Sequence, residues 1–183
     1  MLQAFLSRWI DKFEAQWNYD ASYMRAVARA SPASFVKFAL GTRAPDVKAA
    51  PHEALIAAGL VGTLAEDCGP CTQIGCDIAT ANGVRPEVLR GILAGDAALM
   101  GEKAWLAYRF AKASLARDMD ACDPLRDEIV ARWGDKALVA ISLSLMAARM
   151  YPTLKYALGY GKACSKVVVA GEAAPVAHLA EAA

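Results

Sequence analysis

Apolar residues recur at helical spacing along most of this chain, and no segment alternates apolar and polar residues for long enough to indicate a strand. The composition agrees with this pattern, because 56% of the 183 residues are hydrophobic. Many of them are alanine, which is the best helix former. Proline and glycine occur where the predicted helices begin and end. We therefore predict an all-α protein.

The predicted helices fall into three parts of one domain. Residues 1–45 form an N-terminal helical arm, residues 46–160 a core, and residues 161–183 a loosely held tail of low complexity, in which the apolar run at 167–169 is able to pack. The first helix is amphipathic, with one apolar face and a polar face that carries two charges of each sign. We expect the apolar face to pack on the core or on another subunit rather than on a membrane surface. This face contains Leu2, Phe5, Trp9, Phe13 and Trp17.

Charge and hydropathy disfavour several classes of partner. The formal net charge is +1, so no basic field indicates a nucleic acid. The longest uncharged apolar runs, 54–65 and 137–148, are too short to cross a bilayer, and we expect them to be buried core helices. Charged residues interrupt the N-terminal segment, unlike in a signal peptide. We expect a cytoplasmic protein, and the high hydrophobic fraction favours a homo-oligomer.

A Cys-Gly-Pro-Cys motif at residues 68–71 is the most specific chemical signal in the chain. Two thiols at this spacing can close and reopen a disulfide. The segment 72–82 has helical spacing and ends at a glycine, which predicts Cys68 at a helix N-terminus. Unpaired N–H groups and the helix dipole favour a thiolate there. Because Glu66 and Asp67 oppose ionisation, the sign of the net pKa shift stays open.

Other interpretations of the cysteines are weaker. Zinc needs four ligands, and the remaining cysteines and histidines form no second close pair. These residues are Cys76, Cys122, Cys164, His52 and His178. A thioredoxin fold places this motif after a strand, whereas a predicted helix precedes it here. Two buried, unreactive thiols are the structural alternative. We expect no metal and no bound cofactor.

The order of elements resembles the alkylhydroperoxidase D and carboxymuconolactone decarboxylase superfamily of all-helical proteins with a Cys-x-x-Cys pair at the start of a core helix. The resemblance covers residues 46–160, including the 82–87 turn and the 129–138 segment before an apolar helix. It implies an alkylhydroperoxidase-D-like core and a dimer, trimer or hexamer. It also implies that Cys71 attacks the peroxide and Cys68 resolves it. Helix electrostatics alone favour Cys68 as the attacking thiol, so the two roles stay open.

Two departures from the family's redox pattern concern proton transfer. The family's histidine, four residues after the second cysteine, is replaced by Gly75, and its helper glutamate is replaced by Ile56. A residue at i+4 lies beside the thiol, where histidine can relay a proton and glycine cannot. Glu53 and Glu66 are the available substitutes. The candidate catalytic residues are therefore Cys68, Cys71, Glu66 and Glu53.

The expected function is that of a thiol-dependent oxidoreductase. It would reduce a peroxide or a small disulfide and would itself be reduced by an external thiol. One alternative is lactone chemistry of the decarboxylase branch, which needs a carboxylate or a histidine in the pocket. The other is a helical oligomeric protein with a decayed redox site, which the missing histidine favours and the intact cysteine motif opposes.

Overall fold

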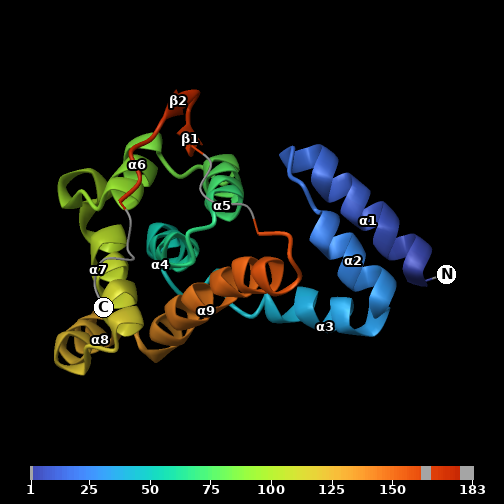
Figure 1. Cartoon of the computed structure of the whole chain (residues 1–183). Coiled ribbons are helices and arrows are strands. Elements are labelled where there is room, and N and C mark those ends of the chain that lie inside the picture. Colours follow the sequence, from blue (N-terminus) through green and yellow to red (C-terminus); the bar gives the residue numbers. More distant parts are fainter. Residues whose placement is uncertain (1, 162–165, 178–183) are drawn as a thin grey trace.

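A computed structural model describes residues 2–161 and 166–177 of the chain. The described part is helical apart from one short hairpin, so the predicted all-α class is confirmed (Figure 1). The helices are α1 (Leu2–Trp17), α2 (Ser22–Ala30), α3 (Pro32–Gly41), α4 (His52–Ala65), α5 (Gly69–Ala81), α6 (Pro86–Ala94), α7 (Ala97–Ala116), α8 (Met119–Trp133) and α9 (Asp135–Ala157). The strands are β1 (Val168–Val169) and β2 (Glu172–Ala173).

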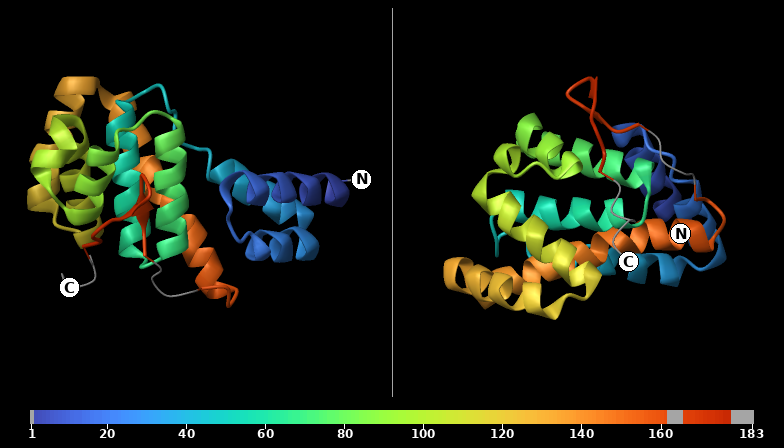
Figure 2. Two further views of the ribbon diagram at one scale, coloured as in Figure 1. Left: turned by 90° about the horizontal axis from the view of Figure 1, so that it is seen from above. Right: turned by 60° about the vertical axis from the view of Figure 1, so that its left-hand side comes forward.

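Helix α4 lies at the centre of the core and packs against α5, α6, α7 and α9, while α8 packs on α7 and α9 (Figure 2). Small residues allow this close packing. An ideal Cβ at Gly62 would lie 2.9 Å from the carbonyl oxygen of Leu145, so a side chain at this position would force α4 and α9 apart. The α4 segment is therefore the buried core helix that its uncharged apolar run predicted.

The arm consists of α1, α2 and α3, which lie beside the core (Figures 1 and 2). It has its own buried cluster, which includes Leu6, Ile10 and Phe35. Arg25 of α2 forms ion pairs with two carboxylates of α1. The predicted apolar face of α1 is only partly covered in this single chain, since Phe5 is 66% exposed. The arm cluster meets the core at residues of α5 and α9, namely Ile74, Tyr151 and Leu154.

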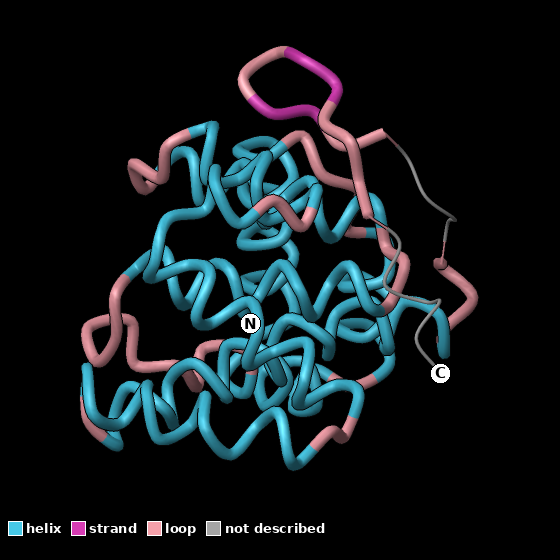
Figure 3. Tube along the Cα trace, turned by 90° about the vertical axis from the view of Figure 1, so that its left-hand side faces the viewer, coloured by secondary structure: helices cyan, strands magenta, loops and turns pink. Residues whose placement is uncertain are grey.

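Part of the tail is packed against the core through the apolar run at 167–169. Strand β1 pairs antiparallel with β2, and the hairpin stands above the helical body (Figure 3). Val167 and Val169 are 1% and 2% exposed. The carboxamide of Gln73 on α5 accepts from the N–H of Val168 at 2.6 Å and donates to its carbonyl at 2.9 Å. Burial and these hydrogen bonds hold the segment in place.

Among the described helices, α9 is long and apolar enough to span a membrane by length and composition. It extends beyond the predicted 137–148 run at both ends. Core helices of soluble proteins pass the same test, and here α9 packs along α4, with 33% of its most apolar window buried. Length and composition alone therefore do not assign α9 to a membrane.

Candidate active site

The two motif cysteines lie at the beginning of α5, as the sequence predicts. Cys68 is the N-cap residue, and Pro70 is in the first turn, where its missing N–H removes no helical hydrogen bond. The N–H of Thr72 donates to the carbonyl of Cys68 at 2.9 Å and closes the first turn. This turn places the Sγ atoms of Cys68 and Cys71 2.7 Å apart, as free thiols joined by a hydrogen bond.

The two sulfur atoms face different surroundings. Cys71 is 4% exposed and lines a cavity of about 580 Å³. Cys68 is 1% exposed and lies against a space of only about 10 Å³, which Val167 and Val176 of the C-terminal segment help to close. A molecule in the large cavity therefore reaches the sulfur of Cys71 before that of Cys68.

The pair stabilises one negative charge on Cys68. The pKa of Cys68 is lowered to about 7, mainly by the hydrogen bond with the Cys71 thiol and further by the Cys71 backbone N–H and the ammonium group of Lys155. Burial and the carboxylate of Asp67 act in the opposite direction. The pKa of Cys71 is raised, first by its hydrogen bond with Cys68 and then by burial. The pair thus shares one proton near neutral pH.

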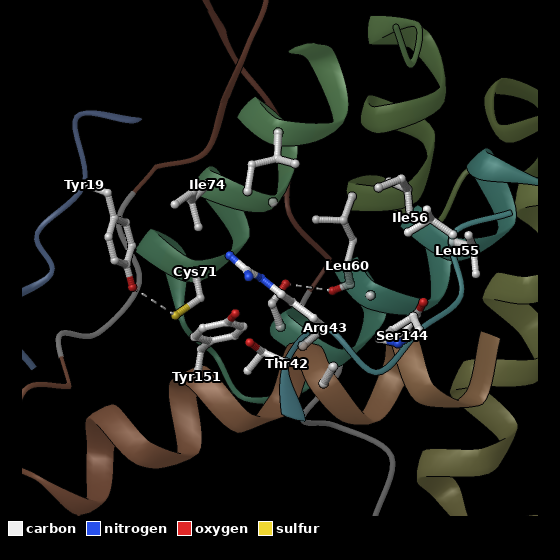
Figure 4. A pocket seen from close by; sticks show the side chains of 18 of the residues that line it. Tyr19, Thr42, Arg43, Leu55, Ile56, Leu60, Cys71, Ile74, Ser144 and Tyr151 are labelled. Carbon is white, nitrogen blue, oxygen red and sulfur yellow. Dashed lines mark hydrogen bonds between the residues drawn. The ribbon is translucent and has the colours of Figure 1, made fainter. Parts of the chain in front are cut away.

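A buried lysine and a tyrosine of the arm stand next to the dithiol. Lys155 of α9 is 5% exposed, and its Nζ donates to the hydroxyl of Tyr19 at 3.3 Å. That hydroxyl lies 3.8 Å from the Sγ of Cys71 (Figure 4). The ammonium group also faces the rings of Tyr19 and Tyr23, at 5.1 and 5.4 Å. No carboxylate pairs with Lys155 within the described residues.

This arrangement gives Tyr19 the role of a donor. Burial is the main cause that raises the pKa of Tyr19, so its hydroxyl stays protonated at neutral pH. Because the lysine occupies a lone pair of the tyrosine oxygen, the phenolic proton is free to point at the sulfur of Cys71. The lysine and the tyrosine together stabilise negative charge on the dithiol.

The large cavity lies between the arm and the core. One face of α4 forms its long wall, through Leu55, Ile56, Gly59, Leu60 and Thr63. The arm and the α3–α4 connection supply the opposite wall, and the dithiol lies at the Thr63 end. Figure 4 shows Cys71 and Ser144 on opposite sides of this space. The site is therefore an apolar chamber with a thiol at one end.

The predicted carboxylates do not contact the dithiol. Glu66 accepts a hydrogen bond from Nε of Arg149 at 2.6 Å and forms an ion pair with this residue of α9. Glu53 lies in the first turn of α4 and does not line the cavity, whereas its neighbour His52 does. No hydrogen bond in the described structure joins either glutamate to Cys71. Their role as proton acceptors stays a prediction.

Both positions that depart from the family pattern lie on the cavity wall. Gly75 and Ile56 each line the chamber. An ideal Cβ at Gly75 would lie 2.9 Å from Cδ2 of Leu60. The leucine therefore occupies the space into which a histidine at position 75 would extend.

Sequence reasoning missed Tyr19, Tyr23 and Lys155. The only signal for the lysine is a single cation near the end of an apolar helix, which is a common solvent-exposed position. The tyrosines belong to the arm, 52 and 48 positions before Cys71. Nothing in their spacing pairs them with the dithiol, because long-range packing of the arm brings them together.

The other cysteines are separate from this site. Cys76 is 1% exposed, and burial raises its pKa to about 12, with a smaller contribution from Asp77. Cys122 lies 3.5 Å from the hydroxyl of Ser114. Cys164 and His178 fall outside the described residues. The part of the chain that the structure describes holds no cluster of metal-ligating side chains.

Comparisons of the chain with protein-family models, curated proteins and solved structures find no match. The resemblance to the alkylhydroperoxidase D superfamily therefore rests on the motif and the order of the helices alone.

Proposed function

We propose that this protein is a thiol-dependent oxidoreductase whose Cys68 and Cys71 cycle between dithiol and disulfide while reducing an organic peroxide or a small disulfide. The observation that carries the proposal is the pair of free thiols, 2.7 Å apart, with one sulfur on the wall of a chamber of about 580 Å³. Two merely structural buried cysteines need neither this proximity nor a chamber. The resemblance supports the same activity.

Cys71 is the attacking thiol in this proposal, because its sulfur faces the chamber. Its proton passes to the Cys68 thiolate across the 2.7 Å contact. The resulting Cys71 thiolate attacks the outer oxygen of the peroxide; the S–O bond forms, the O–O bond breaks, and the alkoxide takes a proton to leave as an alcohol. Cys68 thus serves first as the local base.

Cys68 then resolves the intermediate. Its sulfur, once deprotonated, attacks the sulfur of the Cys71 sulfenic acid; the S–S bond forms, and the hydroxide leaves as water after taking up a proton. The sum is dithiol plus ROOH giving disulfide, ROH and water. Two equivalents of an external thiol then restore the dithiol. With a small disulfide as oxidant, the same pair gives two thiols in place of alcohol and water.

Lys155 and Tyr19 provide the electrostatic support that the family's histidine would supply. The buried ammonium group favours the dithiol monoanion, and the tyrosine donates to the sulfur when the charge moves to Cys71. Because the tyrosine comes from the arm, the site is complete only when the arm is docked. Lys155 is a positioning residue, since it acts on the sulfur through Tyr19 and through its charge.

Thiol-coupled peroxide consumption tests the function. Cys71→Ser is expected to abolish turnover, and Cys68→Ser to leave a sulfenic acid that a dimedone probe traps. Cys76→Ser is the matched control, because this buried cysteine of the same helix faces neither the other thiols nor the large chamber. Absence of dithiol oxidation by hydrogen peroxide, tert-butyl hydroperoxide and cystine would instead favour a helical protein with a decayed site.

Lactone chemistry is a second candidate, favoured by one observation. His52 lines the chamber, and its Nε2 is buried without a hydrogen-bond partner among the described residues. A histidine in this position is a possible base for lactone isomerisation or decarboxylation. Lactone turnover that survives Cys71→Ser and disappears in His52→Ala would support this candidate over the redox activity.

We also propose that the protein forms a homo-oligomer, a dimer, trimer or hexamer. Exposed apolar side chains on the arm and on α9 support this, among them Phe5 at 66% and Val139 at 57% exposure. Light scattering tests it. A monomer at micromolar concentration would contradict the proposal without affecting the redox chemistry.

A further inference from the structure

The large chamber carries a charge pattern that indicates its ligand. Its walls are mainly apolar, and no aspartate, glutamate or lysine lines it within the described residues. Arg43, in the connection between α3 and α4, is the one permanent charge on the lining there. Such a chamber disfavours cations and favours apolar molecules that carry one negative charge.

Arg43 is positioned to hold an anion inside the chamber. Its side chain extends across the chamber from the α3–α4 connection (Figure 4). The guanidinium carbon lies 5.9 Å above the ring of Trp9, which supports it from the arm. No carboxylate of the described residues pairs with it. An arginine of this kind offers a bidentate site to a carboxylate of a ligand.

The chamber is elongated. Its α4 wall runs from His52 to Thr63, a separation of about 16 Å at the helical rise per residue. A volume of about 580 Å³ lies within the range of ligand-binding pockets. Hydrogen peroxide and cystine fill only a small part of this space. Binding of such small oxidants therefore does not explain why the chamber has a long apolar wall.

An unpartnered donor lies on the wall near the dithiol. Tyr23 is 1% exposed and lines the chamber; its buried hydroxyl makes no hydrogen bond of ordinary length in the described structure and interacts with the Tyr19 hydroxyl only at longer range. A buried polar group without a partner costs free energy, which a ligand oxygen would recover. Burial is the main cause that raises the pKa of Tyr23, so the hydroxyl stays a donor at neutral pH.

We propose that the chamber binds a long-chain carboxylic acid, with the carboxylate on Arg43 and the apolar chain along α4, and that the oxidant delivered to Cys71 is the hydroperoxide of such an acid. The second part rests on the proposed redox function. Tyr23 then donates to a peroxide oxygen beside the sulfur. The products are the hydroxy acid, water and the Cys68–Cys71 disulfide, which an external thiol reduces.

Calorimetric titration of the reduced full-length protein with hexadecanoate tests the binding site, because this probe has the chain and the carboxylate but no peroxide. Saturable binding at one site per chain is expected. Arg43→Gln is expected to weaken it about tenfold or more, as for loss of a charged hydrogen-bonded pair. Arg29→Gln, an exposed arginine of the same arm outside the chamber, is the matched control and should bind normally.

Two further measurements separate the carboxylate from the chain. Hexadecan-1-ol should bind Arg43→Gln and the natural protein equally, since it lacks the charge. Ile56→Trp, which fills the chamber, should weaken both ligands while circular dichroism confirms a folded protein. Equal hexadecanoate affinity in Arg43→Gln and the natural protein would overturn the assignment of the carboxylate to Arg43. If affinity is lost only in His52→Phe, the carboxylate binds at the His52 end of the chamber instead.

The failure of this inference differs from the failure of the proposed function. If tert-butyl hydroperoxide oxidises the dithiol but hexadecanoate does not bind, the redox function stands and the long-chain ligand is wrong. If hexadecanoate binds through Arg43 but no peroxide or disulfide oxidises the dithiol, the hydroperoxide step is wrong. The positive result is a lower KM for linoleic acid hydroperoxide than for tert-butyl hydroperoxide, with this preference reduced in Arg43→Gln.

Discussion

The arm and the core of this protein are stabilised by different kinds of side chain. The core helix α4 is rich in alanine and glycine, and Ala54, Ala57 and Ala58 are fully buried. Small side chains of this kind let four helices approach α4 closely. The arm instead packs aromatic rings, with Trp9 against Phe35 at 5.9 Å between centroids.

This difference divides the tasks at the dithiol. The close-packed core fixes the first turn of α5 and therefore the distance between the two sulfur atoms. The aromatic arm supplies the Tyr19 hydroxyl and covers Lys155 with two rings. The chamber is lined by residues of both the arm and the core. The two cysteines thus belong to the core, whereas the side chains that support them, Tyr19 and Lys155, come from the arm and the core. Loosening the arm should therefore slow oxidation of the dithiol before it destabilises the core.

The largest expected effect comes from a cavity in the arm. Phe35 is 2% exposed, and Phe35→Ala is expected to cost about 3–5 kcal/mol, which favours local opening of the arm by roughly 10² to 10⁴. Hydrogen exchange should then accelerate in residues 2–41 and much less in α4 and α7. Leu89→Ala, in the core, is the matched control and should destabilise the whole chain instead. Uniform acceleration in both variants would show that arm and core unfold as one unit.

Removing the buried cation is the next largest change. Lys155→Met is expected to raise the pKa of Cys68 from about 7, by about one unit, because an opposite charge favours the thiolate. Alkylation by iodoacetamide rises with pH as the thiolate forms, so its midpoint should move upward and the rate at pH 7 should fall severalfold.

Lys155→Arg, which keeps the charge, should restore much of the alkylation rate. A merely structural role for the lysine would change the melting temperature without moving the midpoint of the pH profile.

A smaller effect is expected when the hydroxyl that the arm supplies to the dithiol is removed. Tyr19→Phe keeps the ring that covers Lys155 but removes the hydroxyl next to Cys71. We expect a threefold to tenfold loss in the rate of dithiol oxidation, as for one modest hydrogen bond. Tyr108→Phe removes the hydroxyl of a buried core tyrosine, 4% exposed, far from the dithiol in the fold, and should react normally. Equal rates in the two variants would mean that the arm contributes only packing.

The sequence was sufficient to predict the helical class and the place of the dithiol, because both depend on local patterns. Helical spacing and the capping of α5 are properties of neighbouring residues. The same holds for the start of α3, where Ser31 caps Ser34 beside Pro32. The resemblance to the alkylhydroperoxidase D superfamily, rather than a local rule, singled out Gly75 as a departure from that family's redox pattern.

The placement of Tyr19 and Lys155 beside the dithiol could not be predicted from the sequence, because it depends on how distant segments pack. Tyr19 and Lys155 are 136 positions apart and meet only when the arm docks against the end of α9. Nearness in sequence to Cys68 predicts a role for Glu66 at the dithiol, yet its carboxylate pairs with Arg149 of α9. The same holds for the contact between α5 and the tail, since nothing local indicates that Gln73 binds the backbone of Val168.

The smallest effect is expected for a substitution in the core that would replace the polar group supplied by the arm. Gly75→His restores the base of the family pattern, but the side chain must displace Leu60, whose Cδ2 lies 2.9 Å from the ideal Cβ. The helix gains a few tenths of a kcal/mol from the loss of glycine. In the proposed mechanism Cys68 accepts the proton of Cys71, so dithiol oxidation by hydrogen peroxide should change by less than about threefold in this variant, well below the contribution of a needed base.

The double variant Tyr19→Phe with Gly75→His then decides whether the core can replace the arm at this site. If the imidazole reaches Cys71, it supplies a hydrogen-bond partner for the sulfur, and the rate lost in Tyr19→Phe should return in the double variant. If the losses in oxidation rate are additive, Leu60 keeps the histidine away from Cys71, and only the arm can supply the donor. A single Gly75→His variant that is ten times faster than the natural protein would contradict the proposal that Cys68 is an adequate base.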